Sequence, residues 1–216
     1  MIKAVIFDLD GTLIDTERYY RKVWPQALEH FGYHPSDKQI LELRSLGRPF
    51  APKKLKEWFG DDFDYDTVRE YRKQLFDECV KRDGIKLKPG VLQLLEYLKE
   101  KGIIIAIATA TDGKRTAQYL EMAGISDYVD IICSAANVKE GKPSPDVYIQ
   151  ACKQLKLAPE YCFAVEDSPN GIKSAYSAGL RVIFIPDQTR DEPEAEKLTF
   201  AKVNTADEII KICDLK

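Results

Sequence analysis

Two acidic residues, Asp8 and Asp10, follow a short apolar run near the start of the chain. The run, residues 4–7, reads Ala-Val-Ile-Phe and is typical of a buried strand, so both carboxylates stand at the carboxyl end of that strand. Carboxylates this close resist ionising together unless a cation or a shared proton relieves their repulsion. The pair therefore predicts metal-dependent chemistry, with one carboxylate left free to act as a nucleophile or a proton carrier.

A second acidic pair, Glu166 and Asp167, follows the apolar run 162–165 in the same way. Ligands of an open parallel sheet gather outside the carboxyl ends of the strands, so two acidic pairs from separate strands would share one site. Such a site is rich in carboxylate oxygens, which are the ligands that Mg²⁺ prefers. We therefore expect the chain to bind Mg²⁺.

Two further residues are suited to holding a phosphate. Thr109 ends another apolar run, and its hydroxyl, with the backbone amides that enter the next predicted helix, can hold a phosphate oxygen. Lys142 lies in the segment Gly-Lys-Pro-Ser-Pro, residues 141–145, whose glycine and prolines fix the loop just before a predicted helix. That setting favours an anion-binding role for the lysine.

A parallel sheet is needed to bring these side chains together. Short runs rich in Ile, Val and Phe suit strands buried on both faces, and they occupy residues 2–8, 103–109, 129–133, 162–166 and 181–185. Helical patterns lie between the later runs, and we expect them to begin at the N-cap residues Asp112, Ser144 and Ser168. The alternation predicts an α/β fold, a doubly wound parallel sheet with a Rossmann-like core.

Residues 16–88 interrupt this pattern directly after the first strand. They contain many helix formers and aromatic residues, and the spacing of Tyr20, Val23, Trp24, Ala27, Leu28 and Phe31 gives one apolar helix face. We expect residues 1–15 and 89–216 to form the α/β core domain and residues 16–88 to form an all-helical cap domain that serves as a lid. The charged stretch 187–197 is expected to be a surface loop.

Composition excludes several classes of protein. The chain has 216 residues, 44% of them hydrophobic and 31% charged, which is ordinary for a globular protein. A formal net charge of -3 gives no basic surface for nucleic acid, and no segment approaches the ~20 apolar residues that span a membrane. Five cysteines without C-x-x-C spacing indicate free thiols in the cytoplasm, and neither histidine has a metal-ligand spacing.

The four motifs, in this order, resemble those of the haloacid dehalogenase-like superfamily of hydrolases. Asp8-Leu9-Asp10-Gly11-Thr12 matches the first motif, Thr109 the second, Lys142 the third and Glu166-Asp167 the fourth. The resemblance spans essentially the whole chain. The helical insertion resembles the cap of the subgroup that includes β-phosphoglucomutase and phosphoglycolate phosphatase.

This resemblance implies a role for each motif residue. Asp8 would attack the phosphorus to give an aspartyl-phosphate, and Asp10 would serve as acid and then as base. Lys142 and Thr109 would hold the phosphoryl group. Mg²⁺ would be bound by the Asp8 carboxylate, the Asp10 backbone carbonyl and Asp167, with Glu166 either binding the metal directly or standing behind its ligands. True dehalogenases lack an acid at the position of Asp10, so carbon–halogen cleavage is disfavoured.

Three functions remain open at this point. We expect a phosphatase acting on a small phosphorylated metabolite; the alternatives are a β-phosphoglucomutase-like phosphomutase and a non-catalytic phosphate-binding protein. Tyr20 stands where the mutases carry a histidine, and Arg48 follows Gly47 directly, whereas the mutases place an arginine three residues after the glycine. Substrate contacts are expected from Tyr20, Trp24, Arg44, Arg48, Ala110 and Thr111. The expected assembly is a monomer or a weak homodimer.

Overall fold

The computed structural model describes residues 2–189 and 192–214. In this part of the chain six parallel strands form one sheet, in the order β3-β2-β1-β4-β5-β6. The strands are β1 (Ala4–Phe7), β2 (Ile104–Thr109), β3 (Ile131–Ser134), β4 (Cys162–Glu166), β5 (Arg181–Phe184) and β6 (Ala201–Lys202). The α/β prediction is confirmed. The sequence did not indicate β6, because two residues are too few to show a strand period.

Strand β1 lies where the order of the sheet reverses. Phe7, its last residue, pairs with Ile107 of β2 on one side and with Val165 of β4 on the other. This register places the residues after β1 between the carboxyl ends of β2 and β4. Such a switch point is where open α/β sheets bind their ligands.

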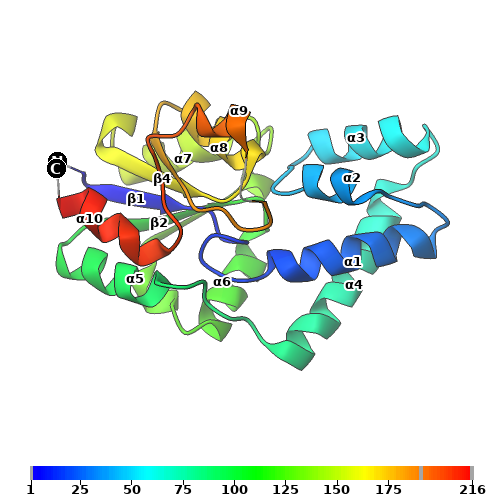
Figure 1. Cartoon of the computed structure of the whole chain (residues 1–216), viewed down its shortest axis with the longest axis horizontal. Coiled ribbons are helices and arrows are strands. Elements are labelled where there is room, and N and C mark those ends of the chain that lie inside the picture. The colour runs from blue at the N-terminus through cyan, green and yellow to red at the C-terminus, as the bar shows by residue number, and fades with distance from the viewer. Residues whose placement is uncertain (1, 190–191, 215–216) are drawn as a thin grey trace.

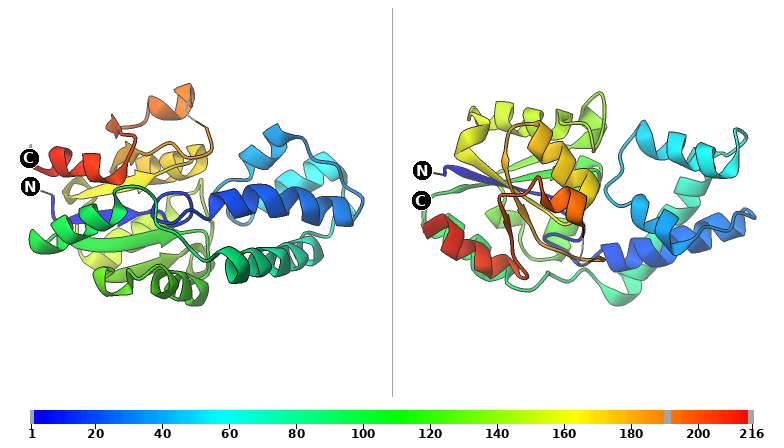
Figure 2. Two further views of the ribbon diagram at one scale, coloured as in Figure 1. Left: turned by 60° about the horizontal axis from the view of Figure 1, so that its bottom comes forward. Right: turned by 45° about the horizontal axis from the view of Figure 1, so that its top comes forward.

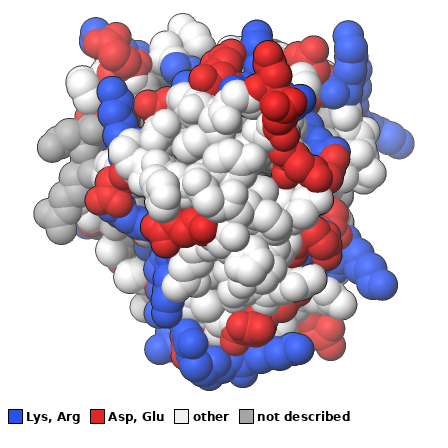
Figure 3. Space-filling view, turned by 90° about the vertical axis from the view of Figure 1, so that its right-hand side faces the viewer, with Lys and Arg blue, Asp and Glu red and all other residues white. Residues whose placement is uncertain are grey.

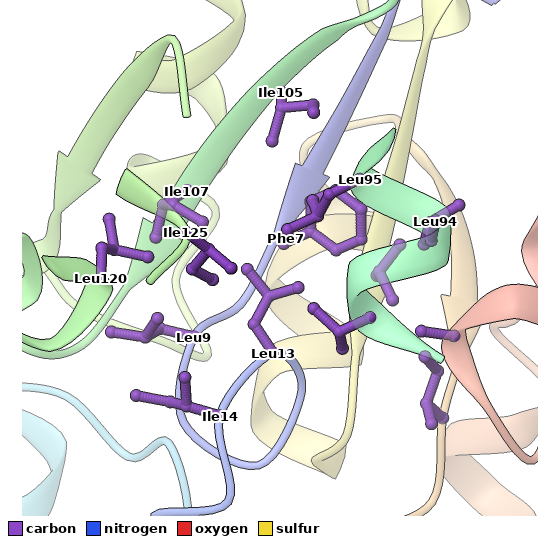
Figure 4. Close-up of a cluster of buried hydrophobic side chains, with 14 of the residues drawn as sticks. Phe7, Leu9, Leu13, Ile14, Leu94, Leu95, Ile105, Ile107, Leu120 and Ile125 are labelled. Atoms are coloured by element: carbon purple, nitrogen blue, oxygen red, sulfur yellow. The ribbon is translucent and has the colours of Figure 1, made fainter. Parts of the chain in front are cut away.

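Helices cover both faces of the sheet (Figure 1). One layer contains α5 (Val91–Glu100), α6 (Gly113–Met122) and α10 (Ile209–Asp214), and the other contains α7 (Asp146–Leu155), α8 (Pro169–Ser177) and α9 (Pro193–Glu196). Strand side chains alternate between the two layers, so Val5 and Phe7 pack on the first and Ala4 and Ile6 on the second. Figure 4 shows Phe7 beside Leu95 of α5.

Four helices lie beside the carboxyl end of the sheet (Figures 1 and 2). They are α1 (Glu17–His30), α2 (Asp37–Glu42), α3 (Phe50–Phe59) and α4 (Tyr65–Asp83), and residues 16–88, which contain them, are called the cap below. The predicted apolar face of α1 is buried at Val23, Trp24, Ala27 and Leu28. Phe31 departs from that prediction: the helix ends at His30, and Phe31 is 38% exposed and packs against the rings of His30 and Tyr71.

Two of the three predicted helix starts are confirmed. Asp112 accepts a hydrogen bond from the Arg115 amide at the start of α6, and Ser168 accepts one from the Gly171 amide at the start of α8. The prediction for Ser144 is wrong, because Pro145 is the N-cap of α7. The backbone of Ser144 belongs to a turn that closes on the Gly141 carbonyl, and its hydroxyl donates to Asp146 instead of capping the helix.

The charged stretch 187–197 is not a surface loop throughout. It contains α9, and the Asp187 side chain is 6% exposed and pairs with Lys88 at 2.5 Å. Glu192 pairs with Arg44 of the cap. Residues 190 and 191 of this stretch lie outside the described residues. The expectation is corrected because several of these charges have partners on other segments.

The end of the cap that is remote from the sheet presents a broad uncharged area with charged side chains around its margin (Figure 3). Short 3₁₀ turns lie in the loops of the core at Ser126–Tyr128, Ala135–Asn137, Pro159–Tyr161 and Ala206–Glu208. Across the described residues, every helix is too short or too polar to cross a bilayer.

Candidate active site

The carboxylates that follow β1 and those at the end of β4 meet in the interior. Asp8 and Asp10 come directly after β1, Glu166 is the last residue of β4, and Asp167 follows it. Asp8 is 2% exposed, and Glu166 and Asp167 are fully buried. Asp8, Glu166 and Asp167 each offer an oxygen, and these oxygens lie within 4.8 Å of one another. Three carboxylates are therefore concentrated in a space that excludes water.

Lys142 supplies a positive charge to this group. Its ammonium is fully buried and donates to Asp8 Oδ1 at 2.5 Å and to Glu166 Oε1 at 2.6 Å. The Tyr148 hydroxyl, from the first turn of α7, donates to the same Glu166 oxygen at 2.6 Å. Lys142 and Tyr148 thus fix the orientation of Glu166, and one lysine faces three acids.

Among the residues that the structure describes, no hydrogen-bond donor reaches four buried carboxylate oxygens of this group: Asp8 Oδ2, Glu166 Oε2, and Oδ1 and Oδ2 of Asp167. Burying charged oxygens without partners is costly unless a cation compensates them. Their number, chemistry and convergence fit Mg²⁺, which takes carboxylate oxygens as ligands.

Two glycines leave room for these carboxylates. A Cβ on Gly11 would lie 2.5 Å from Asp167 Oδ2, and Gly11 has φ +87°, a conformation that favours glycine. A Cβ on Gly171 would overlap the Glu166 carboxylate. At both positions the backbone lies so close to a carboxylate that only glycine fits.

Burial is the largest influence on the pKa values of Asp8, Glu166 and Asp167. It raises the pKa of Asp8, although Lys142 opposes the shift, and it raises the pKa of Glu166 to about 7. The pKa of Asp167 is raised well above its ordinary value by burial and then by the charge of Asp8. Burial alone would lower the pKa of Lys142, but the carboxylates of Asp8 and Glu166 outweigh it and raise that pKa. A cation entering the group would therefore compete with protons.

Asp10 is held apart from this group by two hydroxyls. Thr16 Oγ1, at the start of the cap, donates to Oδ1 at 2.5 Å, and Thr111 Oγ1, after β2, donates to Oδ2 at 2.8 Å. Burial and the neighbouring Asp8 raise the pKa of Asp10. Thr109 is buried beneath, and its hydroxyl accepts a hydrogen bond from the Thr111 amide. Asp10 is thus oriented separately from the other acids and binds a proton more readily than an exposed aspartate.

A cavity of about 440 Å³ lies between the cap and the carboxyl end of the sheet. Asp8, Asp10, Ala110 and Thr111 line it from the core. The cap contributes Tyr20 and Trp24 together with six cationic residues: Arg21, Arg44, Arg48, Arg69, Arg72 and Lys73. The substrate residues predicted from the sequence therefore share one cavity.

Tyr20 and Arg48 occupy different settings in this cavity. The Tyr20 ring stacks on Phe76 with centroids 4.4 Å apart, and burial followed by the charge of Asp10 raises its pKa well above the ordinary value. Tyr20 is therefore a neutral, packed side chain. Arg48 has a side chain that is 55% exposed and forms an ion pair with Asp66 of α4. Its charge is already compensated within the cap.

The cap is joined to the core beside Lys142. The Gly47 amide donates to the Lys142 carbonyl at 2.8 Å, and the Gly141 amide donates to the Arg48 carbonyl at 2.6 Å. A Cβ on Gly47 would lie 2.6 Å from the Cα of Gly141, so only glycine fits there. The cap and the core are therefore in direct backbone contact beside Lys142.

A second junction of cap and core lies at Arg44. Its guanidinium pairs with Glu192 at 2.8 Å, and its carbonyl accepts a hydrogen bond from the Asn170 amide group at 3.0 Å. Arg44 was expected to contact substrate. Its side chain instead reaches core residues, although it also lines the cavity.

Several residues of the site were missed by the sequence reasoning. Tyr148 was one of them, although its position in the first turn after the lysine loop points it toward that loop. Arg69 and Arg72 were also missed; their spacing of three on α4 places them on one helix face, and that spacing was the available signal. Asp15-Thr16, which follows the first motif, resembles the same subgroup, but the contact of Thr16 with Asp10 was not expected, since an N-cap threonine is common at any helix start.

The comparisons with known proteins agree with this geometry. Residues 5–185 match the model of the haloacid dehalogenase-like hydrolase family. The chain is 30% identical over 187 residues to the phosphorylated carbohydrates phosphatase of Thermotoga maritima, covering 85% of this chain and 84% of that protein. It is 31% identical over 183 residues to hexitol phosphatase A of Escherichia coli, covering 85% and 82%.

A solved structure extends the similarity to the arrangement of the whole chain. A variant of CbbY from Rhodobacter sphaeroides in complex with xylulose-(1,5)bisphosphate superposes with a TM-score of 0.81 at 28% identity, covering 97% of this chain and 96% of that one. Fold, motif order and sequence similarity thus lead to one assignment. The chain belongs to the haloacid dehalogenase-like hydrolase family.

Proposed function

We propose that the protein is a Mg²⁺-dependent phosphatase that hydrolyses a small phosphorylated sugar or polyol through an aspartyl-phosphate on Asp8. The observation that carries the proposal is the contact of Asp8 with Lys142 beside the unpartnered oxygens of Asp167 and Glu166. The printed names of the two phosphatases compared above support a phosphorylated carbohydrate as the substrate class.

In the first step an Asp8 oxygen attacks the phosphorus, and the bond from phosphorus to the sugar oxygen breaks. The leaving oxygen takes a proton from Asp10, whose raised pKa favours the protonated form that this step needs. In the second step Asp10 takes a proton from water, and the water oxygen attacks the phosphorus. Inorganic phosphate leaves and the Asp8 carboxylate is restored.

The surrounding residues position the reacting groups. Lys142 holds one Asp8 oxygen, so its charge lies next to the phosphoryl group in both steps. In this proposal Ala110 and Thr111, which line the cavity, and the buried Thr109, whose hydroxyl accepts from the Thr111 amide, help to hold the phosphate oxygens. Mg²⁺ would add positive charge at the same place, bound by the Asp10 carbonyl and by the carboxylates of Asp8, Glu166 and Asp167.

In this proposal residues 16–88 act as a cap domain and residues 1–15 and 89–216 as the catalytic core. The contacts of Gly47 and Arg48 with the lysine loop close the cavity, which excludes bulk water from the phosphoryl group. The free cysteines support a cytoplasmic setting, and four of the five are buried.

The phosphomutase alternative is disfavoured by two observations. Tyr20 is packed against Phe76 at the position where the mutases carry a histidine, and its raised pKa keeps it neutral. Arg48 is paired with Asp66. Incubation with β-glucose 1-phosphate decides the matter, since accumulation of glucose 6-phosphate would favour the mutase and release of inorganic phosphate the phosphatase. Non-catalytic binding is disfavoured because all four motifs are present.

The proposal is tested with p-nitrophenyl phosphate in the presence of Mg²⁺ and of a chelator. We expect hydrolysis that requires the metal and that falls by about 10³-fold or more in Asp8→Asn, because the nucleophile is lost. Asp127→Asn is the matched control, since Asp127 is exposed on a turn away from the cavity. Hydrolysis that persists in Asp8→Asn at the wild-type rate would refute the catalytic assignment.

A further inference from the structure

The cationic side chains at the cap end of the cavity differ in whether they have partners. Four of the six face a carboxylate: Arg21 lies 3.8 Å from Asp37, Arg44 pairs with Glu192, Arg48 pairs with Asp66, and Lys73 pairs with Glu70. Arg69 and Arg72 have no hydrogen-bond or ion-pair acceptor within residues 2–189 and 192–214. These two side chains come from successive turns of α4.

Arg72 is packed between aromatic rings, although no described residue offers it an acceptor. Its guanidinium carbon lies 4.6 Å from the centroid of the Trp24 ring and 5.0 Å from that of Tyr20, and its Nε is buried without a partner. Contacts with ring faces orient the guanidinium plane and leave the N–H groups at its edge unpaired. Tyr20 is fixed in turn by stacking on Phe76. The donors of Arg72 are thus pre-oriented before any ligand arrives.

The charge of Arg72 is also uncompensated. Burial lowers its pKa first, and the neighbouring charges of Arg69 and Arg115 lower it further, while Tyr20 and Tyr65 oppose the shift. Arg115 has its own partners in Asp77 and Tyr119. An anion between Arg69 and Arg72 would relieve this repulsion and satisfy the buried donor.

A purely structural role for Arg72 accounts for only part of this arrangement. Packing on Trp24 and Tyr20 explains why the side chain is ordered, but it does not explain a second unpaired arginine on the next turn. The acids that line the cavity, namely Asp8, Asp10, Asp112 and Glu17, belong to the core or to the first turn of α1. Both arginines therefore present unpaired donors to the cap end of a cavity whose opposite end is acidic.

We propose that Arg72 and Arg69 form a second anion site, and that the preferred substrate is a sugar phosphate with a second anionic group remote from the phosphoryl group transferred at Asp8. The second group is a phosphate or a carboxylate, both of which accept paired hydrogen bonds from a guanidinium. A cavity of about 440 Å³ is within the range of small-ligand sites. This inference rests on the proposed phosphatase function and specifies its substrate class.

The test compares sugar phosphates that carry one anionic group with relatives that carry two. The pairs are fructose 6-phosphate with fructose 1,6-bisphosphate, and glucose 6-phosphate with 6-phosphogluconate. Release of phosphate gives kcat and KM for each substrate. A preference for fructose 1,6-bisphosphate identifies the second group as a phosphate, and a preference for 6-phosphogluconate identifies it as a carboxylate. We expect the wild type to favour that member in kcat/KM by roughly tenfold or more, mainly through KM.

Variants assign that preference to Arg72. Arg72→Gln is expected to lose most of the preference, the conservative Arg72→Lys to keep part of it, and Arg69→Gln to lose less than Arg72→Gln. Arg82→Gln is the matched control, because Arg82 lies on the same helix, pairs with Asp83 and does not line the cavity. If Arg72→Gln unfolds, the substrate pairs on the wild type and the other variants still decide the question.

Three results would overturn the inference: no preference within either pair, a preference that survives in Arg72→Gln, or a preference that Arg82→Gln loses equally. Hydrolysis of p-nitrophenyl phosphate by the wild type separates the two proposals. A wild type that hydrolyses it without preferring either doubly anionic sugar lacks the second site only. A wild type that does not hydrolyse it with Mg²⁺ lacks the proposed function itself.

Discussion

The two ends of the cavity carry opposite charge and are built differently. At the core end, rigid strand ends hold an excess of buried carboxylates around one lysine. At the cap end, helices hold an excess of arginines, two of which have no acceptor among the described residues. Each end is thus short of the opposite charge. The core end carries more carboxylates than cations, and the cap end carries more cations than carboxylates.

In the proposed function, the core end carries the chemistry common to the family and the cap end selects the substrate. The groups of the core end come from the four family motifs, and their mutual contacts position the groups that would act in phosphoryl transfer. The cap end has no corresponding motif in this sequence. Arg44 and Arg72 illustrate the contrast within the cap, because the Arg44 guanidinium pairs with Glu192 of the core whereas Arg72 has no carboxylate partner among the described residues. A buried, unpaired charge is the stronger indication of a ligand.

Replacing Lys142 by Met is the most severe way to disturb the core end. Lys142 is in contact with Asp8 and Glu166, so its removal leaves these two buried carboxylates without their counter-charge, close to the buried Asp167. We expect phosphatase activity to fall by about 10³-fold and the free energy of unfolding in chelator at pH 8 to fall by about 3 kcal/mol. Initial rates and urea unfolding measure the two effects.

Lys139→Met is the control for that variant, since Lys139 is an exposed lysine in the segment before the same loop. It should retain both activity and stability. A Lys142→Met protein that is as stable as the control in chelator would show that the carboxylates do not depend on this lysine for their charge balance.

The core end was more predictable from the sequence than the cap end. Asp8, Asp10, Glu166 and Asp167 follow apolar runs, and a parallel sheet brings such positions to one edge whatever the loops do. Tyr148 could not be assigned in this way, because its contact with Glu166 depends on how α7 is oriented after the lysine loop.

Pairing of charges in the cap could not be deduced from the sequence either. Arg48 was expected to meet substrate, yet it pairs with Asp66, and that contact depends on how α4 packs beside the loop at Gly47. Arg72 is the opposite case. The sequence does not reveal that Arg72 has no acidic partner among the described residues while the neighbouring Lys73 pairs with Glu70. Helix spacing fixes which residues share a face, but only packing decides which of them find partners.

Gly47→Ala disturbs the junction between the two ends. The added Cβ would lie 2.6 Å from the Cα of Gly141 and 3.1 Å from the amide nitrogen of Lys142, and backbone atoms cannot move aside cheaply. The cap should therefore close less completely. We expect kcat/KM to fall by about tenfold, because small displacements of positioned groups are costly in catalysis.

Gly113→Ala is the control for the junction, as a Cβ there would meet only Ser134 Cβ at 4.0 Å. Gly113→Ala should melt near the wild-type temperature, whereas Gly47→Ala should melt somewhat lower, because the clash strains the two backbone hydrogen bonds of the junction. Equal kcat/KM in Gly47→Ala and the wild type would show that this contact does not govern closure.

Mg²⁺ should stabilise the protein in a pH-dependent way. The folded-state pKa values of Asp8, Asp10, Glu166 and Asp167 are raised, that of Glu166 to about 7, so their protonated forms stabilise the metal-free fold at low pH. That stability is lost as the pH rises through the raised values. In chelator the Tm should therefore fall between pH 5 and pH 8.

Mg²⁺ binds the deprotonated carboxylates, so its effect is expected to be larger at pH 8, where it should raise the Tm by about 5 °C or more. Asp167→Asn is the comparison variant and should show a smaller increase, because Asp167 contributes two of the unpartnered oxygens. Thermal melts with and without Mg²⁺ at both pH values measure this. A larger increase at pH 5 than at pH 8 would contradict the assignment of these carboxylates as the cation site.

The smallest expected effect comes from Arg48→Gln, and it sharpens the contrast within the cap. Arg48 already has a carboxylate partner in Asp66, and its side chain is 55% exposed, so water and Asp66 both compete with any substrate anion. The same substitution at Arg72 removes donors that have no other acceptor. We expect Arg48→Gln to change the preference between fructose 6-phosphate and fructose 1,6-bisphosphate by less than about threefold, since exposed ion pairs contribute little. Both variants are measured in parallel. If Arg48→Gln loses more of the preference for fructose 1,6-bisphosphate than Arg72→Gln does, the second anion binds at the loop of Gly47 and not at α4. The paired arginine, and not the unpaired one, would then select the substrate.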